Sequence, residues 1–473
     1  MTKRIKGLFG TQDLTEGNIL LGLTKFVIPL LIGSIAQMLY TTVDAMIVGN
    51  FMGEKGDQAL AAIGASMPIQ NLFLVFVMAI GMGVMTMAAQ YYGAKDYDSL
   101  ALTIGNSITL ILIFSVIISA VATPLTPAIL RLTATPSDSF ALAEVYLKIL
   151  FLGTIGNGFY NVLSGILRAV GDSVFPLLIL LGTVILNTGL DILFVAGFGW
   201  GTMGAAWATV ISQVLSSAVC LIKVLRMKNI VNIRFDMLRL KRGTVAHITR
   251  LGLPTGVSMA IMFLSNLITQ PLINRMGYMV MAAMTATMRV DGFALLPSQS
   301  FSMAAGTFTG QNIGAGRMDR VKKGSITVFL MCLVFSAVMV GAILLFGRHI
   351  FELFTQTEEL INMGMSFIWV MVPAYLVMAA NMSYQGVMRG AGDSIGTMWI
   401  SILINVLMKV PLTYLIVHLT KSEVYPNGNP KSMFYAMLIC MLVGCVITML
   451  YYRLGKWKTK SIIHHDAPAA DAL

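Results

Sequence analysis

The chain has 473 residues, of which 57% are hydrophobic and only 11% are charged, and its mean hydropathy is +0.81. Soluble domains carry about 25% charged residues, so this composition excludes a soluble multidomain enzyme, a disordered chain and a disulfide-stapled domain. The net charge of +11 is explained by basic loops that orient a membrane protein, so it gives no reason to expect a nucleic-acid partner.

Twelve apolar stretches follow one another along the chain, and each approaches the roughly 20 residues that a membrane-spanning helix needs. The runs lack the alternation of polar and apolar residues that is typical of a membrane β-barrel. The first run is longer than the apolar core of a signal peptide, so we expect it to remain as a span. The sequence therefore predicts an all-α membrane protein. The twelve predicted spans are centred near Ser34, Val75, Leu112, Gly153, Leu181, Ser212, Met262, Phe293, Val334, Met371, Ile404 and Leu442.

The two halves of the chain resemble each other. GILRAVGDS (165–173) recurs as GVMRGAGDS (386–394), and AQYYGAKDYD (89–98) recurs at the same offset of 221 as GQNIGAGRMD (310–319). Six spans in each half give both halves the same orientation, as in transporters built from parallel repeats, so we expect two six-helix bundles around a central cavity. The predicted parts are an N-terminal lobe (1–226), a basic cytoplasmic linker (227–247), a C-terminal lobe (248–455) and a polar cytoplasmic tail (456–473).

Basic residues predict the orientation of the chain. If the N-terminus is inside the cell, 23 of the 32 Lys and Arg residues fall on the inner side, six fall on the outer side, and three fall within spans. Inner loops of membrane proteins carry an excess of basic residues, so both termini are expected in the cytoplasm. The three basic residues within spans are Lys148, Arg289 and Lys409.

Three acidic residues lie within predicted spans: Asp44, Asp191 and Asp291. Each costs about 2.5–3.5 kcal/mol at the bilayer centre, so such residues mark functional sites. Asp44 and Asp191 lie at similar depth near the outer ends of spans one and five, and Asn187 precedes Asp191 by one helical turn on the same face. These oxygen atoms suit a hard cation or a shared proton. The alternative is two aspartates that reach the membrane surface separately.

Asp291 has two basic residues within its own half of the chain. Arg289 is two positions away and points off the same helical face. Lys409 lies in another span and can meet Asp291 in the interior of the lobe. We expect a structural ion pair between Asp291 and Lys409, and a role in transport is the alternative.

The repeated Gly-Asp-Ser loops (171–173 and 392–394) are predicted to be turns whose Asp and Ser cap the following helix. Residues 390–393 (GAGD) also fit the G-x-G-D string of intramembrane aspartyl proteases. That chemistry requires a second aspartate at the same depth to share a proton, and the sequence offers none. A turn with a cap is therefore the better interpretation.

The sulfur-containing residues have simple interpretations. The cysteines lie in apolar stretches without the paired spacing of metal ligands, so they are predicted to be small buried side chains. Five methionines between residues 276 and 288 either pack the core or form an adaptable cavity wall. The cysteines are Cys220, Cys332, Cys440 and Cys445, and the methionines are Met276, Met279, Met281, Met284 and Met288.

The chain resembles the multidrug and toxic compound extrusion (MATE) family from about residue 15 to residue 455. The resemblance rests on an N-terminal P…Q..Y..VD pattern that ends at Val43-Asp44, on the LRAVGDS and MRGAGDS loops, and on LNTGLDILF (186–194) and GAAWATVIS (204–212). It implies a cation or proton site, with Na⁺ as the candidate metal, formed by Asp44, Asn187, Asp191 and Thr209. It also implies a conformational hinge at Pro29 and a substrate pathway along Gln37, Tyr40, Asn161 and Ser164. Ser164 stands where the family has a second amide, and span seven lacks the glutamate of the branch whose site is C-terminal.

The predicted function is that of a bacterial inner-membrane antiporter. It would export cationic or amphipathic compounds in exchange for H⁺ or Na⁺ by alternating access, as a monomer and without enzymatic activity or a cofactor. Its expected partners are drug-like small molecules, organic cations and the lipid bilayer. The alternative is a lipid-linked oligosaccharide flippase of the same superfamily, for which a strongly basic cavity would be expected because the substrate carries phosphates.

Overall fold

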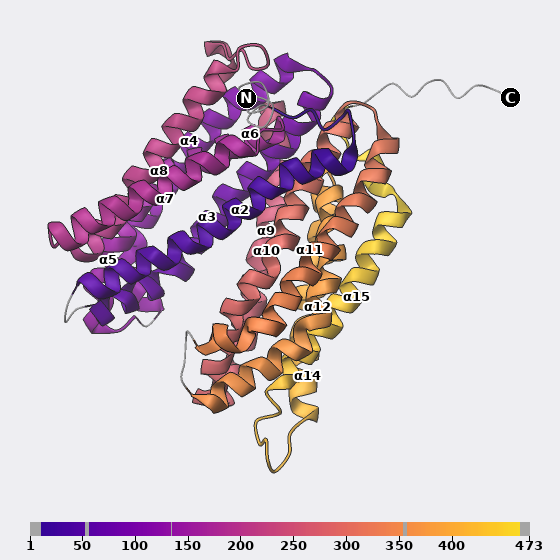
Figure 1. Ribbon diagram of the computed structural model, residues 1–473. Helices are drawn as coiled ribbons and strands as arrows, with labels where there is room; N and C mark the ends of the chain where they lie inside the picture. Colours follow the sequence, from indigo (N-terminus) through magenta and orange to yellow (C-terminus); the bar gives the residue numbers. More distant parts are fainter. Residues whose placement is uncertain (1–10, 53–55, 134, 353–356, 464–473) are drawn as a thin grey trace. The chain divides into compact units, whose positions relative to one another are not determined.

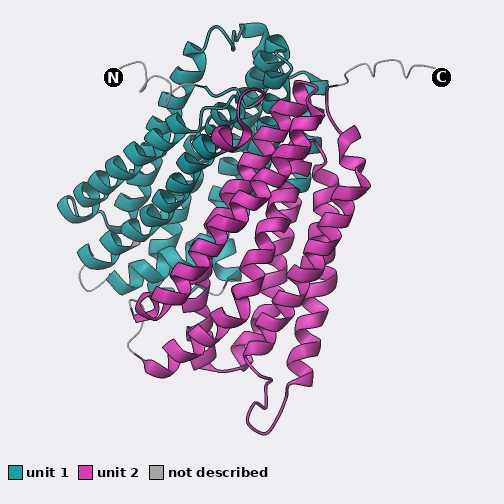
Figure 2. Ribbon diagram, turned by 45° about the vertical axis from the view of Figure 1, so that its right-hand side comes forward, with its two compact units in different colours: residues 1–14, 24–256 teal, residues 15–23, 257–473 magenta. Residues whose placement is uncertain are grey.

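The computed structural model describes residues 11–52, 56–133, 135–352 and 357–463, and its regular elements in these ranges are all helices (Figure 1). The predicted tail lies partly outside these ranges, as do the basic residues Lys3, Arg4, Lys6 and Lys55. The chain divides into two compact units (Figure 2). Unit 1 comprises Thr24–Gly256 with the residues before Thr15, and unit 2 comprises Thr15–Leu23 and Val257–Leu473. The boundary therefore falls within the helices α2 and α9.

The helices follow the predicted apolar stretches. Those of the first half are α2 (Ile19–Phe51), α3 (Gly56–Gly93), α4 (Tyr97–Leu132), α5 (Ser137–Leu152), α6 (Thr154–Ala169), α7 (Val174–Asp191), the π-helix η2 (Ile192–Gly197), α8 (Gly201–Arg226) and the 3₁₀-helix η3 (Phe235–Leu238). Those of the second half are α9 (Arg242–Arg275), α10 (Tyr278–Gly314), α11 (Met318–Glu352), α12 (Glu358–Gly390), α13 (Ser394–Ile402), the π-helix η4 (Leu403–Met408), α14 (Lys409–Leu419), α15 (Lys431–Leu454) and the 3₁₀-helix η5 (Lys456–Thr459).

Within the described residues, eleven helices are long and apolar enough to cross a membrane. A twelfth candidate is the pair α5 and α6, which passes the same test when joined and is bent by 48°. The break in this pair falls at Gly153, the predicted centre of span four. The predicted all-α architecture of about twelve spans is therefore confirmed, and the fourth span is broken in the middle.

Close helix packing in each unit depends on glycine. A Cβ atom on Gly390 of α12 would lie 2.2 Å from the carbonyl oxygen of Gly306 on α10, and one on Gly252 of α9 would lie 2.1 Å from the carbonyl oxygen of Ala79 on α3. Lipid tails are as apolar as the surfaces of membrane helices, so these helices gain no hydrophobic driving force when they pack together. They associate through small residues, which let their backbones approach closely. At these glycines the backbones of the two paired helices are in direct contact.

The two Gly-Asp-Ser loops form the predicted turns. Gly171 and Gly392 have φ values of +90° and +95°, which a side chain disfavours. The carboxylates cap the next helix, since Asp172 accepts from the amide of Phe175 (2.9 Å) and Asp393 accepts from that of Gly396 (3.0 Å). The prediction of aspartate caps is confirmed, whereas the side chain of Ser173 makes no capping bond.

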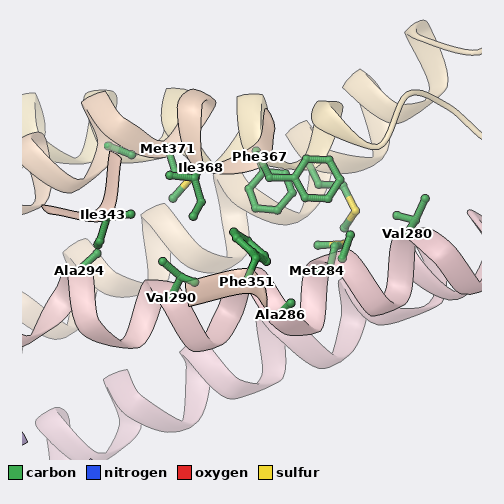
Figure 3. Packing of buried hydrophobic residues seen from close by; sticks show 14 of the residues in the cluster. Val280, Met284, Ala286, Val290, Ala294, Ile343, Phe351, Phe367, Ile368 and Met371 are labelled. Atoms are coloured by element: carbon green, nitrogen blue, oxygen red, sulfur yellow. The ribbon is translucent and has the colours of Figure 1, made fainter. Parts of the chain in front are cut away.

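A buried apolar cluster in unit 2 joins α10, α11 and α12 (Figure 3). Met284 is part of this cluster, and Met276 and Met279 pack against it, whereas Met281 and Met288 are exposed. The methionines therefore divide between core packing and an exposed face. All four cysteines are buried free thiols, as predicted.

The linker is attached to unit 1. The side-chain amide of Asn106 on α4 donates to the carbonyl oxygens of Met237 (2.9 Å) and Arg239 (3.2 Å), and its oxygen accepts from the amide of Lys241 (2.6 Å). The hydroxyl of Thr109 donates to Leu238 (2.7 Å). Because these contacts use backbone groups, they hold the path of the linker whatever basic side chains it carries.

Candidate functional site

Two buried aspartates form the centre of the candidate site in unit 1. Asp44 lies in α2, seven residues before its end, and is 9% exposed, whereas Asp191 is the last residue of α7 and is fully buried. The two carboxyl groups lie close enough that the charge on one acts on the other.

Asn187 and Thr209 complete the cluster. In the amide orientation that satisfies both of its ends, Asn187 donates to Asp191 Oδ2 (2.9 Å) and accepts from the backbone amide of Thr209 on α8 (3.2 Å). The hydroxyl of Tyr40 on α2 donates to the hydroxyl of Thr209 (3.5 Å). The four residues that the sequence grouped as an ion site therefore lie together, on three different helices.

The site has unused capacity for a cation or a proton. Oδ1 of Asp44 and Oδ1 of Asp191 are buried and find no hydrogen-bond partner in the described part of the chain. Two adjacent buried carboxylates repel each other unless a proton or a cation neutralises one charge. The donor set of two carboxyls, an amide and a hydroxyl consists of hard oxygen atoms, which suits Na⁺ as well as a shared proton. No cluster of three or more His, Cys, Asp or Glu side chains suited to a metal occurs among the described residues.

The surroundings of the site are apolar and locally irregular. A buried apolar cluster includes Val48 and Val195, which follow Asp44 and Asp191 by four residues, and Tyr146 on α5. The π-helix η2 begins directly after Asp191. π-Helical turns are rare and occur frequently at functional sites, because the extra residue in the turn changes the direction of the neighbouring side chains. The low polarity of the cluster strengthens every electrostatic interaction between the carboxyl groups.

The predicted substrate-pathway residues are more dispersed. Gln37 is exposed, while Asn161 on α6 donates to the backbone and side-chain oxygens of Asn157 (2.9 Å each). Ser164 accepts from the guanidinium of Arg168 (3.2 Å) and does not extend the amide pair. The amide that contacts Asn161 is therefore Asn157, one turn before it, and the role of these residues in a substrate pathway stays a prediction.

A small pocket lies beside the break between α5 and α6. Asn157 lines it together with the amides Gln70 and Gln213 and the aromatic ring pair Phe73 and Phe151. Asn157, Gln70 and Gln213 were not among the predicted site residues. The spacing of four between Asn157 and Asn161, which places both on one face of a helix, is the signal that could have identified Asn157.

Pro29 lies inside α2, which continues without interruption from Ile19 to Phe51. Proline has no amide hydrogen, so the carbonyl of Lys25 loses its helical partner at this point. The unit boundary lies at Leu23, six residues earlier. The structure therefore contains a weak point in the helix that carries Asp44, and its role as a hinge stays a prediction.

The predicted ion pair between Asp291 and Lys409 is wrong. Asp291 on α10 accepts a hydrogen bond from the hydroxyl of Tyr375 on α12, and Lys409 donates to Oδ1 of Asn266 on α9 (2.6 Å). The phenol of Tyr375 donates to the carboxyl of Asp291, and the amide of Asn266 accepts from the ammonium of Lys409. Each ionisable group is therefore hydrogen-bonded to a neutral side chain.

Asp393 serves as a cap and not as a catalytic acid. Its second carboxylate oxygen accepts from the hydroxyl of Tyr451 (2.7 Å), in addition to the capping bond to Gly396. The carboxylate therefore has a structural function at the start of α13, which agrees with the interpretation of the GAGD string as a turn.

Comparison with known proteins places the chain in a family. The MatE family model matches residues 29–193 and 254–415. The chain is 29% identical over 451 residues to the probable multidrug resistance protein YpnP of Bacillus subtilis. This alignment covers 95% of this chain and 98% of that protein. It is 22% identical to the multidrug export protein MepA of Staphylococcus aureus, with 90% of this chain and 92% of that protein covered.

Solved structures share the fold. An outward-facing structure of a multidrug resistance MATE transporter matches with a TM-score of 0.86 at 23% identity, over 94% of this chain and 97% of that one. A transporter from Pyrococcus furiosus, described as having a binding pocket of reversed polarity, matches with the same TM-score and identity over 93% and 97%. Because the matched family stretches make up more than half of the chain, the protein belongs to the MATE family of membrane transporters and is not an enzyme.

Proposed function

We propose that this protein is a secondary antiporter that exports cationic or amphipathic drug-like compounds in exchange for H⁺ or Na⁺. The observation that carries the proposal is the pair of neighbouring buried carboxyl groups, Asp44 and Asp191, each with a buried oxygen that finds no hydrogen-bond partner in the described part of the chain. The names of the curated relatives, which are multidrug resistance and export proteins, support the class of substrate.

The coupling follows from the charge of the pair. With a proton or Na⁺ bound, the two carboxyls share one compensating charge and stay together in an apolar environment. When the ion leaves, two negative charges remain in contact and repel, which favours a different position of α2 relative to α7. Pro29 gives α2 a place to bend, so the ion can shift the balance between straight and bent forms of the helix.

The curated relatives and the basic residues support a location in the bacterial cytoplasmic (inner) membrane. The curated relatives named above are bacterial, and the excess of basic residues on one side of the predicted topology favours cytoplasmic termini. Asn229 is exposed in the linker, so a cysteine there should react with an impermeant thiol reagent only after the cells are opened. Labelling of Asn229→Cys in intact cells would contradict this orientation.

Everted membrane vesicles test the coupling directly. We expect ethidium uptake to be driven by a pH gradient or by a Na⁺ gradient, applied separately, and to be lost in Asp44→Asn. The amide keeps the shape of the carboxyl but cannot alternate between charged and neutral forms, so the variant should still insert and bind ethidium. Asp291→Asn is the matched control, because it neutralises a different span aspartate and should keep both gradients effective. Wild-type uptake by Asp44→Asn at normal abundance would place the coupling site elsewhere.

A lipid-linked oligosaccharide flippase is the second candidate. The observation that favours it is Lys409, an intramembrane ammonium that binds a neutral amide and no acid in the described residues. A diphosphate headgroup would pair with such a charge. Movement of a fluorescent polyprenyl diphosphate across proteoliposomes, without ethidium transport, would favour this function over drug export.

A further inference from the structure

Lys409 lies deep within its span. The candidate span Ser394–Leu419 continues for ten residues beyond Lys409, which corresponds to about 15 Å of helix. The hydrocarbon core is about 30 Å thick, and a lysine side chain is too short to bring its ammonium out of this core from that depth. An ionisable residue in such a position is costly and marks a site that uses its charge.

The ammonium of Lys409 has spare hydrogen-bonding capacity. It carries three N–H donors, and its one hydrogen bond in the described part of the chain goes to Oδ1 of Asn266. The acid of the same unit that lies within a span, Asp291, accepts a hydrogen bond from Tyr375 instead. Asn266 is exposed, and its Nδ2 group makes no hydrogen bond within the described ranges. Two adjacent groups therefore carry N–H donors that no group in the described part of the chain uses.

The internal repeat relates this pair to the carboxyl pair of unit 1. Pro29 of span one corresponds to Pro254 of span seven, and with this offset Thr41, one turn before Asp44, corresponds to Asn266. Spans five and eleven are related by the offset of 221, which places the counterpart of Asn187 at residue 408, next to Lys409. Corresponding spans thus carry acids in unit 1 and a base in unit 2.

A π-helix accounts for the difference of one residue. The segment η4 ends directly before Lys409, and a π-turn holds one residue more than an α-turn, so Lys409 takes the helical position that Asn187 has in unit 1. The hydroxyl of Ser265 on α9 donates to the carbonyl oxygen of Asn405 within η4 (2.6 Å). This bond holds the irregular segment against the helix that also carries Asn266.

We propose that Lys409 and Asn266 form an oxyanion-binding site in unit 2 that takes the acidic group of the exported compound. The substrate class is then an amphipathic molecule with a carboxylate, sulfonate or phosphate, in most cases a zwitterion. An oxyanion accepts from the ammonium and from the amide Nδ2 at once, and its charge balances the lysine. This inference rests on the proposed export function and assigns its substrate class.

Two dyes that differ by one ester test the site. Rhodamine 110 carries a free carboxylate, and rhodamine 123 is its methyl ester. In everted vesicles, Lys409→Met should lower rhodamine 110 uptake about tenfold, as expected for the loss of a charge-assisted hydrogen bond, and leave rhodamine 123 uptake unchanged. Lys409→Arg should retain both activities. Asn266→Asp should behave like Lys409→Met, because the new carboxylate pairs with the ammonium and competes with the dye.

Binding measurements separate this inference from the proposed function. Fluorescence anisotropy of the purified protein gives the Kd for each dye without any gradient. Weaker binding of rhodamine 110 alone in Lys409→Met supports the site even if wild-type vesicles transport neither dye, a result that would refute export. Equal losses for both dyes, or unchanged affinity for rhodamine 110, would overturn the site. Lys148→Met is the control, since Lys148 is an intrahelical partner of Glu144 and should affect neither dye.

Discussion

Replacing Tyr375 by phenylalanine removes the hydroxyl that donates to Asp291 and keeps the ring in place. Tyr375 is 2% exposed, so the carboxyl group loses its donor in buried surroundings. A hydrogen bond to a charged group contributes about 1.5–3 kcal/mol, and an orphaned buried acceptor costs a similar amount. We therefore expect Tyr375→Phe to lower the free energy of unfolding by about 1.5–3 kcal/mol.

A double-mutant cycle isolates this contact. Asp291→Ala and Tyr375→Phe should be strongly non-additive, with a coupling energy of about 1–3 kcal/mol, because each change removes the same hydrogen bond. The matched cycle of Asp291→Ala with Lys409→Met should be additive within about 0.5 kcal/mol, since the lysine binds Asn266 instead. SDS-induced unfolding in mixed micelles, followed by tryptophan fluorescence, provides the free energies. A larger coupling to Lys409 than to Tyr375 would refute the assignment of partners.

Two further changes test the packing and a buried loop. Gly390→Ala should destabilise unit 2 by about 1–3 kcal/mol in the same unfolding assay, because its Cβ meets the backbone of Gly306, whereas Gly182→Ala meets nothing within 4 Å and should stabilise its helix by about 0.5–1 kcal/mol. Burial raises the pKa of Asp172 in the loop between α6 and α7. The folded state then binds this proton more tightly than the unfolded state, so stability should fall as the pH rises from about 4 through the raised pKa. Asp172→Asn should flatten this dependence in Tm measurements between pH 4 and 7, and an unchanged pH profile would contradict it.

Most of the helices and the carboxyl pair could be predicted from the apolar runs and from the period of an α-helix. Span length depends on bilayer thickness, which the composition of a run reflects directly. The approach of Asp44, Asn187 and Asp191 followed from equal depth and from the spacing of four. Partners across helices were harder, because depth and face do not give the rotation of one helix against another. Asp291 and Tyr375 are 84 positions apart, and the prediction paired Asp291 with Lys409, a residue of opposite charge, instead of the phenol of Tyr375.

The local departures from helical regularity explain the other differences. The 48° bend between α5 and α6 lies beside the pocket that Asn157 lines, whereas the family pattern directed the prediction to Ser164, after Asn161. The π-helix η4 shifts Lys409 by one residue against the repeat. Both features depend on tertiary packing, such as the bond from Ser265 to Asn405, and neither leaves a mark in composition or period.

The repeat gives a physical reason for the opposite charges in the two units. In a single bundle, a carboxyl pair and an ammonium within reach of one another would form an internal ion pair, which neutralises both and removes the capacity of each for a mobile ligand. Separate units allow Asp44 and Asp191 to keep unpartnered oxygens and Lys409 to keep spare donors. Each group is then stabilised within its own unit by a neutral amide, Asn187 in unit 1 and Asn266 in unit 2. Under the proposed function, the exchanged ion balances the charge of the carboxyl pair, and the acidic group of the substrate balances the charge of Lys409. Uncompensated charges within the membrane are unfavourable, so each unit gains stability when its ligand binds.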